Sequence, residues 1–378
     1  MKKSSSHPRI ETLAVHAGER RPGPEGSVVF PIYQGTVYSV EPGTDYHDIR
    51  YIRLSSTPTQ RYLHDKLAAL EGAEAALATT SGMAALTTIL LSFLKKGDHL
   101  IAGDCLYGGT HDFLTRHADD LGLSYTFIDP QRPETWKDAL RPGTKLVLVE
   151  TITNPLMRVP RLREIAAFAR EERLLSVIDN TFASPVNFRP LSAGFDLVFH
   201  SATKYLNGHS DLVGGCILGQ GVGILRLDPQ GERLETAGQE ECGVRVKAQN
   251  ANALALARFL AGHPRVLQVN YPGLETHPDH AHARELLSGF GGMLSFRLKG
   301  GTEAADRLIA ALTLPAFAPS LGGVESLITR PALTSHAGLT RAERDRMGVS
   351  DDLVRMSCGI EAAEDLIEDF RGALEPAS

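Results

Sequence analysis

Three short apolar runs are each followed at once by residues whose side chains can do chemistry. The runs and the residues that follow them are Ala75–Thr79 with Ser81, Gly82 and Met83, Leu174–Ile178 with Asp179, and Leu197–His200 with Ser201, Thr203 and Lys204. Short apolar runs bounded by turn residues predict strands. In a parallel sheet a ligand sits just beyond the carboxyl ends of the strands. We therefore expect a lysine, a carboxylate and a helix start to meet in one site.

A lysine and an aspartate placed in this way suit pyridoxal phosphate (PLP). PLP needs a lysine amine for a Schiff base and an acid that keeps its ring nitrogen protonated, so that the ring can act as an electron sink. Lys204 can supply the amine and Asp179 the acid. Either residue alone has a commoner explanation, since a lysine after a strand is usually at the surface and an aspartate there usually forms a turn.

The third strand end can supply a cradle for the phosphate. Backbone N–H groups at Ser81, Gly82 and Met83 open a helix, and a helix N-terminus favours negative charge. Gly82 lets an anion approach the backbone closely. The hydroxyl groups of Ser201 and Thr203 can complete the cradle. A Ser-Gly helix start alone is commonly only a cap, so the PLP prediction depends on all three strand ends together.

The elements between these residues predict an α/β fold. Further strands are predicted at His99–Ala102, Tyr125–Ile128, Leu146–Glu150 and Cys216–Leu218. A helix should begin with Thr57 as N-cap and Pro58 in its first turn and stop at Gly72, and another should run from Gly82 to Lys96. Strands that alternate with helical segments predict a mostly parallel sheet with helices on both faces.

The sequence pattern changes after about Gly243 and predicts a smaller α+β domain. Its expected elements are helices at Asn252–Leu260, Ala304–Leu312 and Glu361–Leu374 and a strand at Gly292–Leu298. The residues before about Tyr46 are rich in Pro and Gly and predict an arm. We therefore expect an N-terminal arm at 1–50, a PLP-binding domain at 51–243 and a C-terminal domain at 244–378.

Composition and charge exclude several classes of protein. The chain has 378 residues and a net charge of −6 with no basic block, so nucleic acid is not an expected partner. Neither a signal peptide nor a membrane span is expected, because the start lacks an apolar stretch and the longest apolar run, Met83 to Leu94, is too short. The four cysteines stand far apart, which argues against disulfides and favours the cytoplasm.

A histidine cluster between His277 and His282 is expected to be a surface loop, not a metal site. It contains Pro278 and has neither a cysteine nor a pair of carboxylates beside it. No metal is therefore predicted. Cys358, close to Arg355 in the sequence, is expected to be a small packing residue.

Several strings, in order along the chain, resemble the Cys/Met-metabolism branch of fold-type I PLP enzymes. This family includes cystathionine γ-synthase, cystathionine β- and γ-lyases and methionine γ-lyase. The strings are Ser81-Gly82-Met83-Ala84-Ala85, Tyr107-Gly108-Gly109-Thr110, Glu150-Thr151-x-x-Asn154-Pro155, Asp179-Asn180-Thr181-Phe182, Ser201-Ala202-Thr203-Lys204-Tyr205-x-Asn207-Gly208-His209-Ser210-Asp211 and Ser320-Leu321-Gly322-Gly323-x-Glu325-Ser326-Leu327. The Ser-Ala-Thr-Lys run with its tail is the most specific of them.

The resemblance implies roles for individual residues. It implies that Lys204 binds PLP and then moves protons, that Asp179 pairs with the ring nitrogen, and that Tyr107 stacks on the ring. Asn154 is implied to lie near the phenolic oxygen of PLP. Arg355 matches the arginine that binds the substrate α-carboxylate, a task that suits its fork of donors.

Further implied residues bear on the substrate and on assembly. Ser320 matches a serine beside the same carboxylate. Tyr51 and Arg53 match a Tyr-x-Arg pair that reaches into a neighbouring subunit and binds its PLP phosphate. The resemblance therefore implies a homo-oligomer, usually a tetramer built as a dimer of dimers, with an amino acid as its substrate.

Two segments depart from the family pattern. After Arg53 the segment Leu54–Thr59 is longer than usual, and we expect it to keep the following helix start. Between about Leu218 and Val246 the chain is shorter than in family members and bridges the gap with a Gly- and Glu-rich string, Arg233 to Gly243. The shorter bridge puts the docking of the two domains and the entrance for the substrate in doubt, but not the cofactor lysine.

The choice of reaction rests on two positions. Gly109 stands where methionine γ-lyases typically carry cysteine, which disfavours that activity. Pro319 stands where many γ-synthases and γ-lyases have glutamate and β-lyases often have tyrosine. We expect cystathionine cleavage on the γ side, with γ-synthesis from an activated homoserine or β-cleavage as alternatives. The alternative from another functional class is a protein that binds PLP but catalyses weakly and is kept for assembly or regulation.

Overall fold

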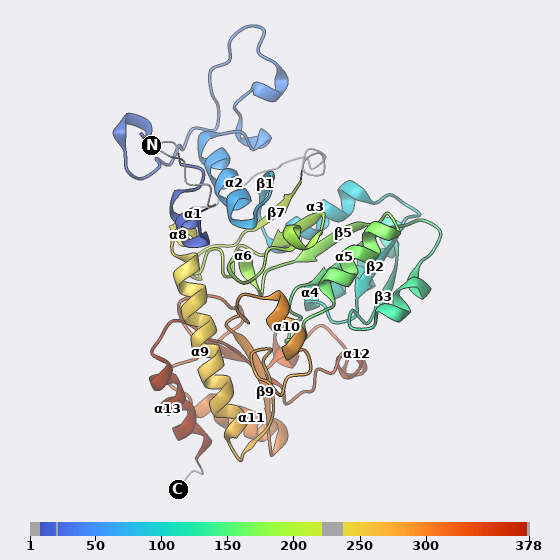
Figure 1. Ribbon diagram of the computed structural model, residues 1–378, viewed down its shortest axis with the longest axis vertical. Helices are drawn as coiled ribbons and strands as arrows, with labels where there is room; N and C mark the ends of the chain where they lie inside the picture. The colour runs from blue at the N-terminus through green and yellow to red at the C-terminus, as the bar shows by residue number, and fades with distance from the viewer. Residues whose placement is uncertain (1–7, 20–21, 221–236, 376–378) are drawn as a thin grey trace.

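Two β-sheets form the framework of the computed structural model, which describes residues 8–19, 22–220 and 237–375 (Figure 1). The larger sheet has seven strands in the order β1-β7-β6-β5-β4-β2-β3. Their bounds are β1 Ala75–Thr79, β2 His99–Gly103, β3 Ser124–Ile128, β4 Thr144–Glu150, β5 Leu175–Asp179, β6 Leu197–His200 and β7 Gly215–Gly219. Only β7 runs antiparallel to its neighbours, which confirms the predicted mostly parallel sheet.

Helices cover both faces of this sheet because successive strand residues point to opposite sides. Leu146, Leu148 and Val177 belong to an apolar cluster with residues of α3 and α4. Val147 and Ile178, their neighbours in sequence, belong to a second cluster with residues of α2 and α5. The helix bounds are α1 Ile10–His16, α2 Pro58–Glu71, α3 Gly82–Phe93, α4 Gly108–His117, α5 Leu162–Glu171 and α6 Ser184–Asn187.

The start of α2 confirms the predicted helix signals. Thr57 accepts a hydrogen bond from the backbone N–H of Gln60, whose side chain in turn accepts from the N–H of Thr57. Such a capping box satisfies two N–H groups that the helix leaves free. Gly72 ends the helix with φ of 74°, a conformation that glycine adopts without strain. The expected retention of this helix start after the longer Leu54–Thr59 segment is therefore confirmed.

The smaller sheet has five strands in the order β10-β11-β12-β9-β8. Their bounds are β8 Val266–Asn270, β9 Met293–Leu298, β10 Ala316–Phe317, β11 Leu327–Thr329 and β12 Val354–Ser357. The remaining helices are α8 Ala237–Glu240, α9 Cys242–Gly262, α10 His280–Leu286, α11 Gly301–Ala311, α12 Arg341–Arg346 and α13 Ala363–Leu374. An apolar cluster joins α9, α11 and α13 to β9, β11 and β12, and it includes Cys358, which confirms the prediction that this residue packs.

The predicted domain boundary after residue 243 falls within the first turn of α9 and remains a prediction. Residues 221–236 of the shortened bridge lie outside the described residues. In the arm, α1 was not predicted, and the segment that follows α1 extends away from the body of the molecule (Figure 1). Among the described helices, none combines the length and the apolar character needed to cross a bilayer.

The prediction of a surface loop between His277 and His282 holds for Pro278 and Ala281, which are exposed, and is wrong for His277 and Asp279. His277 and Asp279 are only 5% and 7% exposed, and burial lowers the pKa of His277 to about 4. The Asp279 carboxylate accepts from the Arg158 guanidinium at 2.6 Å and from the Val159 backbone N–H at 3.0 Å. A carboxylate that satisfies several buried donors explains the burial, because unpaired polar groups are costly inside a protein. Through Asp279, the part of the chain that forms the smaller sheet is therefore bound to Arg158 and Val159, which follow β4.

Candidate active site

A cavity of about 710 Å³ opens at the carboxyl ends of the parallel strands, where segments from the second sheet close over it. This volume is typical of a site for a small cofactor with its substrate. The structure brings eleven of the thirteen predicted site residues to its wall. They are Ser81, Gly82, Met83, Tyr107, Asn154, Asp179, Ser201, Thr203, Lys204, Ser320 and Arg355.

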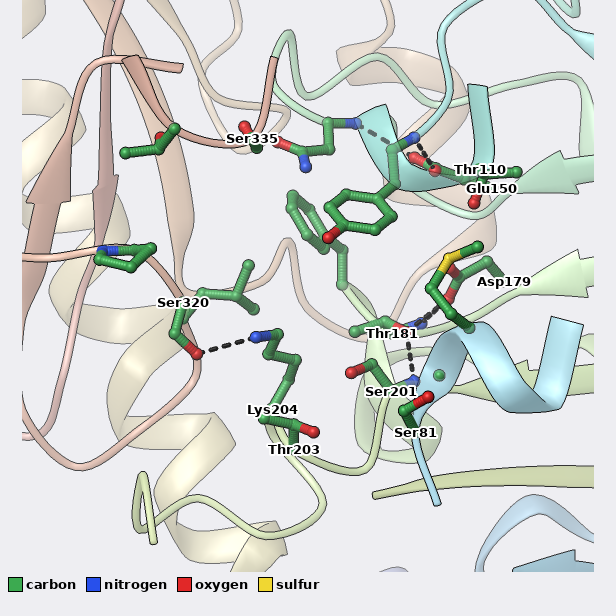
Figure 2. A pocket seen from close by; sticks show the side chains of 18 of the residues that line it. Ser81, Thr110, Glu150, Asp179, Thr181, Ser201, Thr203, Lys204, Ser320 and Ser335 are labelled. Atoms are coloured by element: carbon green, nitrogen blue, oxygen red, sulfur yellow. Dashed lines mark hydrogen bonds between the residues drawn. The ribbon is translucent and has the colours of Figure 1, made fainter. Parts of the chain in front are cut away.

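Lys204 lies just beyond β6 and points into the cavity (Figure 2). Its Nζ donates a hydrogen bond to the hydroxyl of Ser320 at 2.8 Å. Burial, helped by the positive charge of Arg355, lowers the pKa of Lys204 from 10.5 to about 8. A larger neutral fraction makes the amine a better nucleophile toward a carbonyl group.

Ser320 links this lysine to the second sheet. Its φ of 87° is unusual for a residue other than glycine, and such strain is typically held in place by the surrounding structure at functional sites. The Ser320 carbonyl oxygen accepts from Nη2 of Arg355 at 3.2 Å, while its hydroxyl faces Lys204. One strained residue therefore contacts both positive side chains of the cavity.

Arg355 lies in β12 and is 4% exposed. Its Nη1 donates to Oδ1 of Asn154 at 3.1 Å, and burial lowers its pKa to about 10. No carboxylate of the described residues pairs with this guanidinium. A buried cation without a counterion costs several kcal/mol, so the site favours a ligand that brings a carboxylate.

Asp179 ends β5 and is held by the residue two positions later. The N–H of Thr181 donates to Oδ1 of Asp179 at 2.9 Å, and the Thr181 hydroxyl donates to the same oxygen. Burial raises the pKa of Asp179, and the two hydrogen bonds from Thr181 oppose that rise. A partly exposed carboxylate at a cavity wall can pair with a positive ring N–H.

Glu150, at the end of β4, connects two predicted site residues. Its Oε1 accepts from the N–H of Tyr107 at 2.5 Å and its Oε2 from the N–H of Asn154 at 3.2 Å. Burial and the nearby Asp179 raise its pKa well above the ordinary value. Tyr107 is the N-cap residue of α4; it lines the cavity and is 41% exposed, so a ligand can reach it there.

The cradle at the start of α3 leaves no room for a side chain at position 82. A Cβ on Gly82 would lie 2.8 Å from Cβ and 2.9 Å from Cα of Ser201. The Ser81 hydroxyl caps the helix by accepting from the N–H of Ala84 at 3.0 Å. The Thr203 hydroxyl both donates to the carbonyl of Gly214 and accepts from its N–H.

These observations fit PLP. The cofactor requires a lysine amine with a lowered pKa, a carboxylate at the cavity wall, an aromatic ring to stack on, and a helix N-terminus that an anion can approach, here at Gly82. The Thr203 hydroxyl would have to share or exchange its Gly214 bonds to hold a phosphate. The Ser201 hydroxyl makes no hydrogen bond within the described part of the chain.

Tyr51 and Arg53 do not line the cavity of their own chain. Nε of Arg53 donates to the Tyr51 hydroxyl at 2.8 Å, and its guanidinium lies over the Tyr51 ring at 4.8 Å. Both lie in the short segment between the predicted arm and α2. Their role in a neighbouring subunit remains a prediction.

The sequence did not assign roles to several residues that line the cavity. Thr181 and Glu150 could have been found, because each stands at a strand end beside a predicted site residue. Thr334 and Ser335 could not, because they reach the cavity from a loop before α12 with no motif of their own. Ser335 is seen across the cavity from Asp179 in Figure 2.

Comparisons with known proteins agree with this geometry. The family model described as "Cys/Met metabolism PLP-dependent enzyme" matches residues 11–375. A cystathionine gamma-lyase of Bacillus subtilis is 40% identical over 97% of this chain and 99% of its own length. A cystathionine beta-lyase of Coxiella burnetii is 37% identical over 97% of both chains.

The fold is also shared with solved structures. A cystathionine gamma synthase from Xanthomonas oryzae pv. oryzae, in complex with aminoacrylate and cysteine, superposes with a TM-score of 0.91. It is 38% identical, and the match covers 98% of each chain. Such coverage leaves no large part of the chain without a counterpart.

Proposed function

This chain belongs to the Cys/Met metabolism family of PLP-dependent enzymes, and we propose that it cleaves the carbon–sulfur bond of cystathionine-type amino acids on the γ side. The observation that carries the proposal is the meeting of Lys204 and Arg355 in one cavity. An amine with a lowered pKa and a buried guanidinium without a counterion suit a cofactor aldehyde and an α-carboxylate respectively.

Each residue of the site has its own role in the proposed reaction. Arg355 binds the α-carboxylate of the substrate through its fork of donors, with Asn154 and the Ser320 carbonyl holding the fork in place. Lys204 can take the proton from Cα and then the proton from Cβ that γ-cleavage also requires, and can return a proton to the leaving sulfur. The Ser320 hydroxyl, 2.8 Å from Nζ, keeps the amine beside these atoms.

The cofactor, when bound, supplies an electron sink for the pair of electrons left on the substrate when a bond at Cα or Cβ breaks. Asp179 would hold the proton on the ring nitrogen, and Tyr107 would stack on the ring. Backbone N–H groups at Gly82 and Met83, with the Ser201 hydroxyl, bind the phosphate. These assignments are supported by the geometry and by the resemblance of the motifs.

One observation favours γ-cleavage of cystathionine, and a second argues against methionine γ-lyase activity. Two of the most similar relatives, from Bacillus subtilis and Dictyostelium discoideum, are cystathionine gamma-lyases. At Gly109 a Cβ would lie 2.6 Å from the Tyr107 ring and 3.3 Å from the Met83 sulfur, so a cysteine there would have to displace the stacking ring. The site is therefore built for glycine at this position, unlike methionine γ-lyases that carry cysteine.

γ-Replacement is the second candidate, since the chain superposes closely on a cystathionine gamma synthase. The test is a panel of cystathionine, O-succinylhomoserine with cysteine, and cysteine alone, with products identified by mass. γ-Cleavage of cystathionine with water gives cysteine, 2-oxobutanoate and ammonia; β-cleavage gives homocysteine, pyruvate and ammonia. Homocysteine as the main product, or cystathionine made from O-succinylhomoserine faster than it is cleaved, would contradict the proposal.

We also propose a homo-oligomer, a dimer of dimers, that acts in the cytoplasm. Tyr51 and Arg53 lie outside the cavity of their own chain, and the arm before them exposes Val28, Val29 and Val37. Exposed apolar side chains on an extended arm favour contact with a second copy. The four cysteines are all free, which is typical of a reducing compartment. Sedimentation analysis of the purified protein tests the tetramer.

A further inference from the structure

Thr181 occupies the junction between Asp179 and the phosphate cradle. It follows β5 in a turn in which its N–H donates to Oδ1 of Asp179 at 2.9 Å, two residues back. Its hydroxyl lies against the same oxygen (Figure 2). Neither contact follows from the sequence pattern, which gave this threonine no role.

The other partner of the Thr181 hydroxyl comes from the next strand of the sheet. The backbone N–H of Ser201, just beyond β6, donates to Oγ1 of Thr181 at 2.9 Å. A backbone N–H can only donate, so Oγ1 must accept this bond and its own hydrogen is free to point at Asp179. The direction of both hydrogen bonds is thereby fixed.

Ser201 is in turn locked to the helix start that binds the phosphate. A Cβ on Gly82 would come within 2.9 Å of the Ser201 Cα, so the backbones of the two residues are in direct contact. A shift of Ser201 would therefore move both the cradle and the N–H group that donates to the Thr181 hydroxyl. The chain of contacts runs from Gly82 through Ser201 and Thr181 to Asp179.

The two donors of Thr181 leave one carboxylate oxygen of Asp179 for a ligand. Both reach Oδ1, and no hydrogen bond reaches Oδ2 from the part of the chain that the structure describes. Asp179 lines the cavity, so Oδ2 is the oxygen that a ring N–H can approach. The same two donors oppose the rise in pKa that burial causes and so favour the ionised carboxylate.

We propose that Thr181 is a positioning residue that fixes the Asp179 carboxylate relative to the phosphate cradle, so that the two are separated as the ring nitrogen and the phosphate of the cofactor require. This inference rests on the proposed PLP function. Thr181 does not touch the reacting atoms, but it sets the position at which Asp179 meets the ring.

Three variants test it. Thr181→Val keeps the shape but removes the hydroxyl, and Thr181→Ser keeps the hydroxyl. Thr126→Val is the matched control, because it removes a hydroxyl that bonds to Nε2 of His99 at 2.9 Å in β3, away from the cavity wall. PLP affinity is measured by fluorescence quenching on reconstitution of the apo-protein, and protonation of an isotope-labelled ring nitrogen by solid-state NMR.

The expected results differ sharply between the variants. Thr181→Val should bind PLP about tenfold to hundredfold more weakly, since a hydrogen bond to a charged group is lost. Its ring-nitrogen resonance should move toward the unprotonated position, because a less stabilised carboxylate takes more of the shared proton. Thr181→Ser should restore both properties, and Thr126→Val should leave both at the wild-type values whatever it does to stability.

Two outcomes separate the inference from its premise. Wild-type PLP affinity and ring protonation in Thr181→Val, or an equal loss in Thr181→Ser, would overturn the role of the hydroxyl while leaving the PLP site intact. A wild-type protein that binds no PLP at Lys204 would overturn the proposed function itself. If Thr181→Val does not fold, failure of Thr181→Ser to match the wild type in ring protonation still refutes the inference.

Discussion

The Nζ of Lys204 lies 2.8 Å from the hydroxyl of Ser320, a residue 116 positions later in the chain. Lys204 follows a strand of the larger sheet, and Ser320 precedes β11 of the smaller one. The contact therefore joins the two sheets at the proposed reaction centre. The Ser320 carbonyl oxygen also accepts a hydrogen bond from Arg355 at 3.2 Å. Ser320 therefore sets the distance between the Lys204 amine and the Arg355 guanidinium, the group proposed to bind the substrate carboxylate.

The first prediction concerns the Ser320 side chain. Ser320→Ala and Ser320→Gly both remove the acceptor of Lys204 and should lower kcat/KM about tenfold to hundredfold, the value of a hydrogen bond to a charged group. Ser320→Gly should unfold at a higher temperature than Ser320→Ala, because φ of 87° costs alanine about 1–2 kcal/mol that glycine avoids. Equal melting temperatures would show that the strain is absent.

The second prediction concerns Arg355. Arg355→Leu should raise KM for an amino-acid substrate about a hundredfold or more, since the loss of a buried charged partner typically costs 2–5 kcal/mol. Arg355→Lys should recover only a small part of the lost substrate affinity, because lysine lacks the planar fork of donors. PLP affinity, measured on the same samples, should stay near wild type. A fall in PLP affinity with unchanged KM would place Arg355 in the cofactor site.

The third prediction is a pH dependence. Only the neutral amine attacks an aldehyde, so covalent capture of PLP by the apo-protein should speed up as the pH rises through about 8, the lowered pKa of Lys204. Arg355→Leu removes a positive neighbour that contributes to this lowering, so its midpoint should move to higher pH. Stopped-flow absorbance gives the rate. A wild-type midpoint near 10.5, the ordinary value, would contradict the effect of burial.

The fourth prediction tests the cradle by filling it. Gly82→Ala should weaken PLP binding, because the added Cβ would meet the Ser201 Cβ at 2.8 Å and force the cradle apart, typically at about 1–3 kcal/mol. Gly262→Ala is the matched control, since nothing lies within 4 Å of a Cβ at that position. It should leave PLP affinity unchanged. Equal affinity in both variants would remove Gly82 from the cofactor site.

The larger sheet could be predicted because its strands are short apolar runs with turn residues at their ends. The site followed from it, since Lys204, Asp179 and Gly82 all stand at the carboxyl edge of that sheet. The start of α2 could be predicted from Thr57 and Pro58, whose capping roles depend only on local geometry.

The smaller sheet was largely missed because its strands give weak local signals. β11 has three residues and β8 exposes several of its side chains, so neither shows a clear apolar pattern. Likewise, the burial of His277 and Asp279 comes from partners at Arg158 and Val159, more than 100 positions away. Contacts over such separations are not encoded in any short window of the sequence.

The most direct test of the account is to load the protein with PLP, reduce it with borohydride and map the modified peptide by mass spectrometry. We expect a single adduct, on Lys204, and none in Lys204→Ala. Lys66, which is fully buried and bonded to the Ala14 carbonyl at 2.9 Å, should remain unmodified. An adduct on another lysine, or no adduct in wild-type protein offered excess PLP, would contradict the central claim.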